Sequence, residues 1–392
     1  MHRIRKYRTR KLGFESLEGR RLMAGDVQVF VYPTTGELNL VGDSSANAVD
    51  VRGTGNPGEV LITPLTDQAT GQQTTIDGSA APLVMSGVTG GLAANMFAGN
   101  DEFYLKDFAF GGGGWITGNA GADTIRVGAW VAYGTEGTGD VSFAGKLRVS
   151  EQSDNSIADH DNIFVGRVTA ERVEVSGRFG NDYVELYDVT ATGATDGYPT
   201  LYLLGEDGSD SFNIAYTTAY GNAKIIMDTV QTGHDLVSMI TSVIHGTAYI
   251  DVWHGTNTIA LNANQFLMTL DIWSEIGDDT IKLTNSFFNK KVSIASFHTN
   301  NGNDAITVEN NTISERLYVS SGSGNDTIVV QANQIVTAAI YSGAGYDGVI
   351  VRSNIFYGHI DMVAGTEYDV LFLSGNLFYS TYAYYEFESI QP

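Results

Sequence analysis

The chain of 392 residues contains no cysteine and only six prolines. The absence of cysteine excludes disulfides, thiol catalysis and cysteine-ligated metal sites, so hydrogen bonds and burial must hold the fold together. No apolar run approaches the roughly 18 residues that a membrane span needs, and the basic N-terminal stretch lacks the apolar core of a secretory signal. We therefore expect no membrane span.

Basic residues are scarce beyond the N-terminus. Eight of the 22 lysines and arginines lie within the first 21 positions, and the remainder of the chain carries a formal charge of −29. Such an acidic body repels nucleic acid and anionic polymers and attracts cations. We therefore expect no nucleic-acid partner.

Glycine, by contrast, is abundant, with 46 residues, and threonine, valine, isoleucine and tyrosine are frequent. Glycine weakens helix interiors, and the β-branched and aromatic residues favour strands. This composition predicts an all-β protein built from short strands and tight turns.

A turn-then-strand phrase recurs along the chain, Gly-x-Asp-x-φ-x-φ, where φ is apolar. From Asp210 onward its steps are 21 to 25 residues, most often 22, and the step from Asp101 to Asp123 is also 22. One copy has too few apolar residues for a core, so copies must stack. A left-handed hexapeptide helix needs about 18 residues per coil and a propeller blade about 40, so the period predicts a right-handed parallel β-helix. The phrase is centred on Asp123, Asp182, Asp210, Asp235, Asn257, Asp279, Asp304, Asp326, Asp347 and, in a degraded form, Asp369.

One stretch departs from this period. Between Asp123 and Asp182 only Asp161 lies near register, which predicts an irregular coil or an insertion.

A second column shares the period. An asparagine followed two positions later by an apolar residue recurs six or seven residues after the aspartates. We interpret it as a stacked ladder whose amides hydrogen-bond the next coil, since isolated turn asparagines would not keep the period. Its predicted members are Asn264, Asn285, Asn311, Asn333, Asn354 and Asn376.

These patterns divide the chain into four parts. We predict a basic sorting segment at 1–25, a strand-rich cap or degenerate coils at 26–98, the β-helix at 99–378, and a C-terminal cap at 379–392. The last part is aromatic and alternating, which suits it to cover the open strand edge of the final coil.

The segment Leu17–Met23, with its preceding basic run, resembles the LEPR-XLL domain, with Gly19 and Met23 replacing the family's Pro and second Leu. That domain is an N-terminal segment of large surface and secreted proteins, chiefly in planctomycete bacteria. The resemblance implies an extracellular or cell-surface location.

The phrases SGSGNDTIV (321–329) and SGAGYDGVI (342–350) resemble the calcium-binding nonapeptide of RTX proteins. That family places two nonapeptides in each coil, whereas this chain has one. The resemblance implies calcium as a cofactor in the turns where the repeat is cleanest. The expected ligands are the carboxylates of Asp304, Asp326 and Asp347 and the carbonyls of Gly302, Gly324 and Gly345.

Electrostatics favours a cation there as well, because stacked carboxylates about 5 Å apart repel one another and calcium accepts six to eight oxygen ligands. The alternative is that each aspartate accepts hydrogen bonds from its own turn. Asn257 in the same column supports this alternative, since an uncharged residue serves there.

An enzymatic reading must also be weighed, because parallel β-helices host many polysaccharide lyases and hydrolases. The GHD at 233–235 and the GDD at 277–279 superficially resemble polygalacturonase segments, but their order is reversed and no Arg-x-Lys follows. Both Asp235 and Asp279 also fall on the repeat column, where a structural turn explains them.

The sequence therefore favours a non-catalytic structural or adhesive protein that contacts cell-envelope or extracellular-matrix components. The alternative is a carbohydrate-active enzyme or carbohydrate-binding module on the same scaffold. A cleft lined by convergent carboxylates and at least one arginine or lysine would favour the alternative over a smooth rod.

Overall fold

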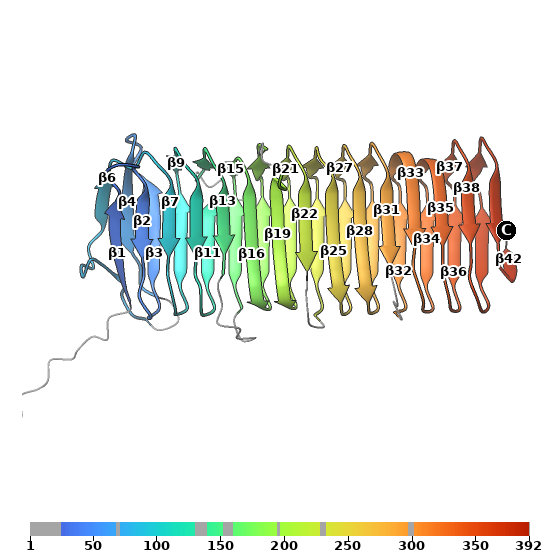
Figure 1. Cartoon of the computed structure of the whole chain (residues 1–392), viewed down its shortest axis with the longest axis horizontal. Helices are drawn as coiled ribbons and strands as arrows, with labels where there is room; N and C mark the ends of the chain where they lie inside the picture. Colours follow the sequence, from blue (N-terminus) through green and yellow to red (C-terminus); the bar gives the residue numbers. More distant parts are fainter. Residues whose placement is uncertain are drawn as a thin grey trace, which may run out of the picture.

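The structure is a computed structural model and describes residues 25–67, 71–129, 139–151, 160–193, 197–227, 233–296 and 302–391. All of the regular structure in these ranges is β-strand. The strands stack along one long axis, from the N-terminal elements at one end to β42 (Ser389–Gln391) at the other (Figure 1). The predicted segment 1–25 lies outside the described residues except for Gly25.

Each regular coil contributes three strands to three parallel ladders. The first ladder runs through the 16-stranded sheet, and the second and third ladders together form the 26-stranded sheet. About 12 coils of about 22 residues are stacked in this way, which confirms the predicted parallel β-helix.

The first strand of the first ladder pairs in parallel with the N-terminal strand β3 (Ala48–Gly53). In the early coils of this ladder, the aspartate phrase comes directly before the strand. It consists of β8 (Glu102–Lys106), β11 (Thr124–Gly128), β14 (Asn162–Gly166), β17 (Tyr183–Tyr187), β20 (Ser211–Ala215), β23 (Leu236–Ile240), β26 (Thr258–Asn262), β29 (Thr280–Thr284), β32 (Ala305–Glu309), β34 (Thr327–Gln331), β36 (Gly348–Arg352), β39 (Val370–Ser374) and β42.

The second ladder is made of short strands. They are β9 (Phe108–Phe110), β12 (Val141–Phe143), β15 (Val168–Ala170), β18 (Thr190–Ala191), β21 (Thr218–Ala219), β24 (Val243–Ile244), β27 (Gln265–Phe266), β30 (Phe287–Phe288), the first part of β33 (Thr312–Ser320), the first part of β35 (Gln334–Tyr341), β37 (Ile355–Phe356) and β40 (Leu377–Phe378).

The third ladder contains the longer strands. They are β7 (Leu92–Asn95), β10 (Gly114–Thr117), β13 (Leu147–Ser150), β16 (Val173–Gly180), β19 (Leu201–Gly208), β22 (Ala223–Met227), β25 (Ala248–His254), β28 (Leu270–Ile276), β31 (Val292–Ser296), the later parts of β33 and β35, β38 (Ile360–Val363) and β41 (Tyr382–Tyr385).

The two ends of the stack differ. At the N-terminal end β1 (Asp26–Val31) pairs antiparallel with β2 (Leu38–Val41), and β3, β4 (Glu59–Pro64) and β6 (Leu83–Ser86) form a second antiparallel group. The short β5 (Thr75–Ile76) pairs parallel with β1. At the C-terminal end β41 and β42 add one more parallel strand to each sheet.

Stacked apolar side chains fill the interior. Along most strands of the first ladder, buried positions alternate with more exposed ones, as the pleat of a strand requires. Phe266 and Phe288 lie in adjacent coils with parallel rings whose centroids are 5.2 Å apart, and Phe356 and Phe378 repeat this arrangement at 5.4 Å. The core is therefore a continuous stack that no single coil could form alone.

Candidate functional site

The predicted aspartates form an unbroken column at the corner before the first ladder. The backbone N–H of each member donates to a side-chain oxygen of the member in the next coil, at N···O distances of 2.6 to 3.0 Å. The column runs from Asn47 through Asp101, Asp123, Asp161, Asp182, Asp210, Asp235, Asn257, Asp279, Asp304, Asp326, Asp347 and Asp369 to Glu388.

This geometry differs from the predicted alternative of an Asx turn. Each Oδ1 accepts the N–H of a residue about 22 positions earlier in the chain, not an N–H of its own turn. An asparagine oxygen accepts such a bond as well as a carboxylate does, which explains why Asn257 fits the column. The two ends, Asn47 and Glu388, escaped the sequence reasoning because neither belongs to a Gly-x-Asp phrase.

Burial disfavours the charged form of several column carboxylates. It raises the pKa of Asp101 and of Asp279 to about 7 and that of Asp347 to about 6, against the opposing effect of the hydrogen bonds that they accept. It also raises the pKa of Asp326. The column therefore supplies hydrogen-bond acceptors at a cost in desolvation.

In several coils a small residue lies five positions before the column aspartate. In the coils of Asp182 and Asp210 that position is Gly177 or Gly205, where an added Cβ would overlap the aspartate Oδ2. In the coils of Asp279, Asp326 and Asp347 it is a serine, whose nearby hydroxyl lowers the pKa of the carboxyl group against the effect of burial. These serines are Ser274, Ser321 and Ser342.

In the coil before Asp161, the equivalent position carries an acidic residue, Glu151. Ser150 pairs with Ser176 of the next coil, so Glu151 stands in register with Gly177. Its side chain is fully buried, and its Oε2 accepts the N–H of Asn119 at 2.9 Å.

Glu151 meets two column members. Ligand oxygens of Asp123, Glu151 and Asp161 all lie within 4.8 Å of one another, and all three residues are buried. Burial, followed by the nearby Asp161 and Asp123 carboxylates, raises the pKa of Glu151 well above its usual value. The sequence reasoning missed this cluster because the residues between Glu151 and Asp161 hide the five-residue spacing.

The predicted calcium ligands lie in three consecutive coils. Asp304, Asp326 and Asp347 are buried column members, and the N–H of each of the first two donates to the carboxylate of the next at 2.8 Å. Gly324 and Gly345 have φ of +141° and +136°, and an added Cβ would overlap the carbonyl oxygen of Gly302 or Gly324 respectively. Calcium binding in these turns stays a prediction.

The predicted asparagine column is also present. Asn333 accepts the N–H of Asn311 at 2.8 Å, and its own amide donates to the carbonyl of Val308 at 2.8 Å and to Oδ1 of Asn354 at 3.0 Å. Asn264, Asn354 and Asn376 make the matching bonds to a neighbouring N–H and carbonyl.

One predicted member of that column is wrong. Ser286, not Asn285, accepts the N–H of Asn264 and donates its own N–H to Asn311. Asn285 takes the left-handed conformation at φ 53°, and Phe287 is 38% exposed while Phe288 is fully buried. The missed signal was the spacing, which is seven residues from the aspartate column at every other predicted position.

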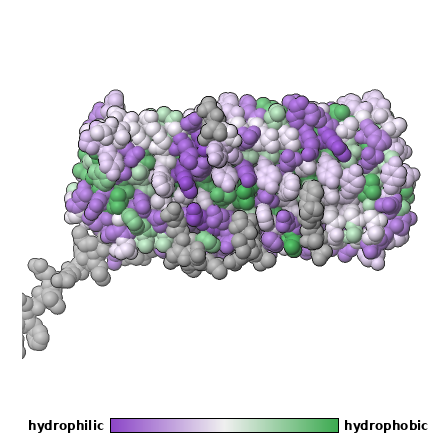
Figure 2. Space-filling view, in the orientation of Figure 1, coloured by the Kyte–Doolittle hydropathy of each residue, from purple (hydrophilic) through white to green (hydrophobic). Residues whose placement is uncertain are grey.

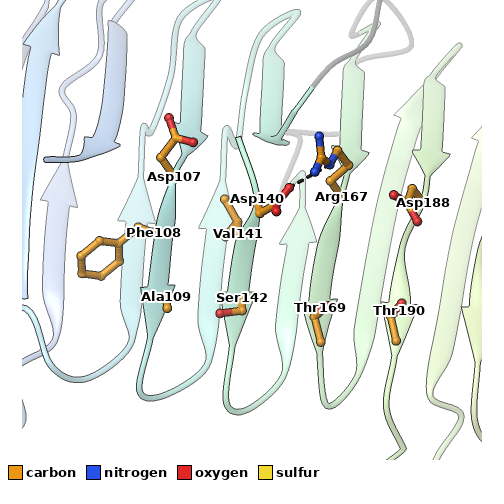
Figure 3. Close-up of a pocket in the computed structure, with 10 residues that line it drawn as sticks. All are labelled: Asp107, Phe108, Ala109, Asp140, Val141, Ser142, Arg167, Thr169, Asp188 and Thr190. Atoms are coloured by element: carbon orange, nitrogen blue, oxygen red, sulfur yellow. Dashed lines mark ion pairs between the residues drawn. The ribbon is translucent and has the colours of Figure 1, made fainter. Parts of the chain in front are cut away.

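A surface groove lies at the corner between the first and second ladders. It has a volume of about 480 Å³ and is lined by Asp107, Asp140, Arg167 and Asp188 among others (Figure 3). Arg167 Nε lies 2.8 Å from Asp140 Oδ1, and the Asp140 side chain is 71% exposed. Figure 3 shows these four side chains in a row along successive coils.

This groove has the residue types that would favour the carbohydrate-active alternative, but it does not have their arrangement. Glycoside hydrolysis requires two carboxylates that flank the scissile bond. Here the charged groups lie side by side along one edge, and the Asp140 carboxylate is paired with the arginine. Asp235 and Asp279, in the segments that resemble polygalacturonases, are buried column members, out of reach of a polymer.

Comparison with protein-family models finds no match, and comparison with curated proteins finds none either. Among solved structures, a hyperactive, Ca²⁺-dependent, β-helical antifreeze protein from an Antarctic bacterium matches with 15% identity and a TM-score of 0.35. The match covers 75% of this chain and 76% of that chain. The similarity is too distant to transfer a ligand or an activity. Within the described ranges, no helix is long and apolar enough to cross a bilayer.

Proposed function

We propose that this protein is a non-catalytic structural rod of the cell surface or extracellular space. The observation that carries the proposal is the aspartate column, which links successive coils from Asn47 to Glu388 without a gap. Each link adds a buried hydrogen bond to those of the strand ladders, so bending the stack would break bonds at several corners at once. Figure 2 shows an elongated body on which hydrophilic and hydrophobic side chains are interspersed.

Rigidity can be measured directly. With about 4.8 Å per coil, 12 coils extend for roughly 60 Å, and the N-terminal strands lengthen the body further. Small-angle scattering of the purified chain should give the profile of a single stiff rod at all salt concentrations. A profile that shortens or broadens with salt would show a jointed body and contradict the proposal.

The surface location rests on the LEPR-XLL resemblance and the acidic body. We expect the full chain, expressed in a planctomycete host, to be accessible to an antibody on intact cells. Replacing Arg20 and Arg21 by Ser should abolish this surface display while total protein is unchanged. Display unaffected by that change would remove the support that the resemblance gives.

Calcium stabilisation of the turns at Asp304, Asp326 and Asp347 belongs to the same proposal. Binding there is expected to be weak, because each carboxylate is buried and already accepts a backbone N–H. Raising calcium from micromolar to millimolar should increase the melting temperature of the wild type, and a triple change of these residues to Asn should remove that increase. Coincident melting curves in micromolar and in millimolar calcium would mean that the column acts through its hydrogen bonds alone.

The groove at Arg167 supports carbohydrate binding as a second candidate function. Its hydroxyl-bearing lining, with Ser142, Thr169 and Thr190 in neighbouring coils, can hydrogen-bond a neutral sugar chain that lies along the rod. A panel of neutral and acidic polysaccharides should show binding that Thr169→Val weakens. Depolymerisation of any of them, abolished by Asp140→Asn, would establish an enzyme instead.

A further inference from the structure

The strongest unexplained feature of the described structure is the carboxyl group of Glu151. It lies at a position where the two neighbouring coils carry Gly118 and Gly177, so the fold itself does not require an acidic side chain there. Burying a third carboxylate beside two others is unfavourable unless a proton or a cation compensates for the charge.

The geometry is that of an oxygen-lined cation site. Oε2 of Glu151 is held by the N–H of Asn119, while its Oε1 is buried and has no hydrogen-bond partner. The ligand oxygens of Asp123, Glu151 and Asp161 lie within 4.8 Å of one another, which a single ion with metal–oxygen distances of about 2.4 Å can bridge.

We propose that Asp123, Glu151 and Asp161 together bind one calcium ion in the coil that runs from Asp123 to Asp161. Calcium suits this site better than magnesium, because it accepts carboxylates in flexible geometry, whereas magnesium demands near-ideal octahedral coordination and keeps several waters. All three protein ligands are hard oxygen donors, which disfavours the soft transition metals. This site is separate from the predicted weak sites at Asp304, Asp326 and Asp347.

Binding is tested on the full chain after removal of metal with chelator. Titration with micromolar calcium, read by native mass spectrometry and calorimetry, should show one bound ion per chain. Hydrogen exchange of the wild type should slow on calcium addition in the peptides that contain Asn119 and Glu151. Absence of a micromolar site would overturn the proposal, and so would exchange that slows only around Asp326.

Two variants separate a cation from a proton shared between Glu151 and Asp123. Glu151→Gln keeps the shape, and Glu151→Ser introduces the residue that regular coils carry. Both should lose the bound ion and melt identically in micromolar calcium and in chelator, whereas the wild type should melt about 3 °C or more higher with calcium. In chelator both variants should melt no lower than the wild type, because one buried charge is gone.

Asp326→Asn is the matched control in the regular column. It should keep the micromolar ion and the calcium-dependent rise in melting temperature. Loss of the ion in this control together with its retention in Glu151→Gln would place tight calcium binding in the regular column and overturn the assignment. If calcium does not change the melting temperature of the wild type, a shared proton, not a cation, compensates for the buried charge.

Discussion

The corner before the first ladder is built differently in the coils from Asp279 to Asp369 and in the coil that carries Glu151. In the regular coils an aspartate reaches the preceding N–H, and a serine hydroxyl or a small residue lies beside it. In the irregular coil the same bond is made by Asp161, but a second carboxylate occupies the small residue's place. The fold thus needs one acceptor at each corner with an uncharged neighbour, and the additional charge of Glu151 is a local specialisation.

The regular coils can be broken most severely at the glycine of the turn. Gly324 has φ +141°, and a Cβ there would overlap the Gly302 carbonyl oxygen. Gly324→Ala should therefore lower the free energy of unfolding by about 4 kcal/mol or more, or prevent folding. Chemical denaturation measures the loss.

Gly348→Ala serves as the control, because an added Cβ there meets nothing within 4 Å. Equal stabilities of the two variants would show that adjacent turns do not approach as closely as the structure places them.

The asparagine column gives the next largest effect. Asn333→Ala removes one acceptor and two donated bonds at a buried site, at a cost of about 1 to 3 kcal/mol. Asn333→Ser should lose less, because Ser286 shows that a hydroxyl can accept the same N–H. A melting temperature unchanged by the alanine substitution would mean that this column does not stabilise the stack.

The charge of the aspartate column is tested by pH. Asp279 has a folded pKa of about 7, raised from 3.8, so its contribution to stability is present in acid and is lost as the pH rises through 7. Asp279→Asn should therefore help the protein more at pH 8 than at pH 5, relative to the wild type. Thermal melts of both proteins at the two pH values give this difference, and Asn257 shows that the column accepts asparagine. The same difference at both pH values would contradict burial of the charged form.

The smallest expected effect concerns the corner between the first and second ladders, where the regular coils have a residue in the left-handed conformation. Ala332 adopts φ 55° and is exposed, so Ala332→Gly relieves backbone strain without removing packing. The expected gain is up to about 1 kcal/mol, set against the greater freedom of glycine in the unfolded chain. Denaturant melts should show a midpoint at or above that of the wild type, and a clear loss would contradict this account.

The repeating parts of the structure could be predicted from the sequence because the same pattern of residues recurs in successive coils. The ladder strands, the aspartate column and five of the six asparagines follow from a period of about 22 residues. Asn285 was placed wrongly because it lies next to Ser286, and asparagine is common both in the column and in left-handed turns.

Features that occur once could not be read from periodicity. Glu151 is ten positions from Asp161 instead of five, so its place beside the column emerges only when the strands are paired. The groove at Arg167 lies only partly on the period: Asp107, Arg167 and Asp188 each follow a column aspartate by six residues, whereas Asp140 does not, so the groove emerges only when successive corners line up in space.

The hydrogen bonds of the aspartate column all point the same way, and this gives the molecule a direction of growth. The column N–H of any coil finds its acceptor only in the following coil, so a nascent chain emerging N-terminus first always presents one unmet donor at its tip. Each newly synthesised coil satisfies the donor before it and creates the next. Vectorial synthesis can therefore proceed by adding each new coil onto the finished surface of the coil before it, up to the N–H of Asp369, which Glu388 accepts.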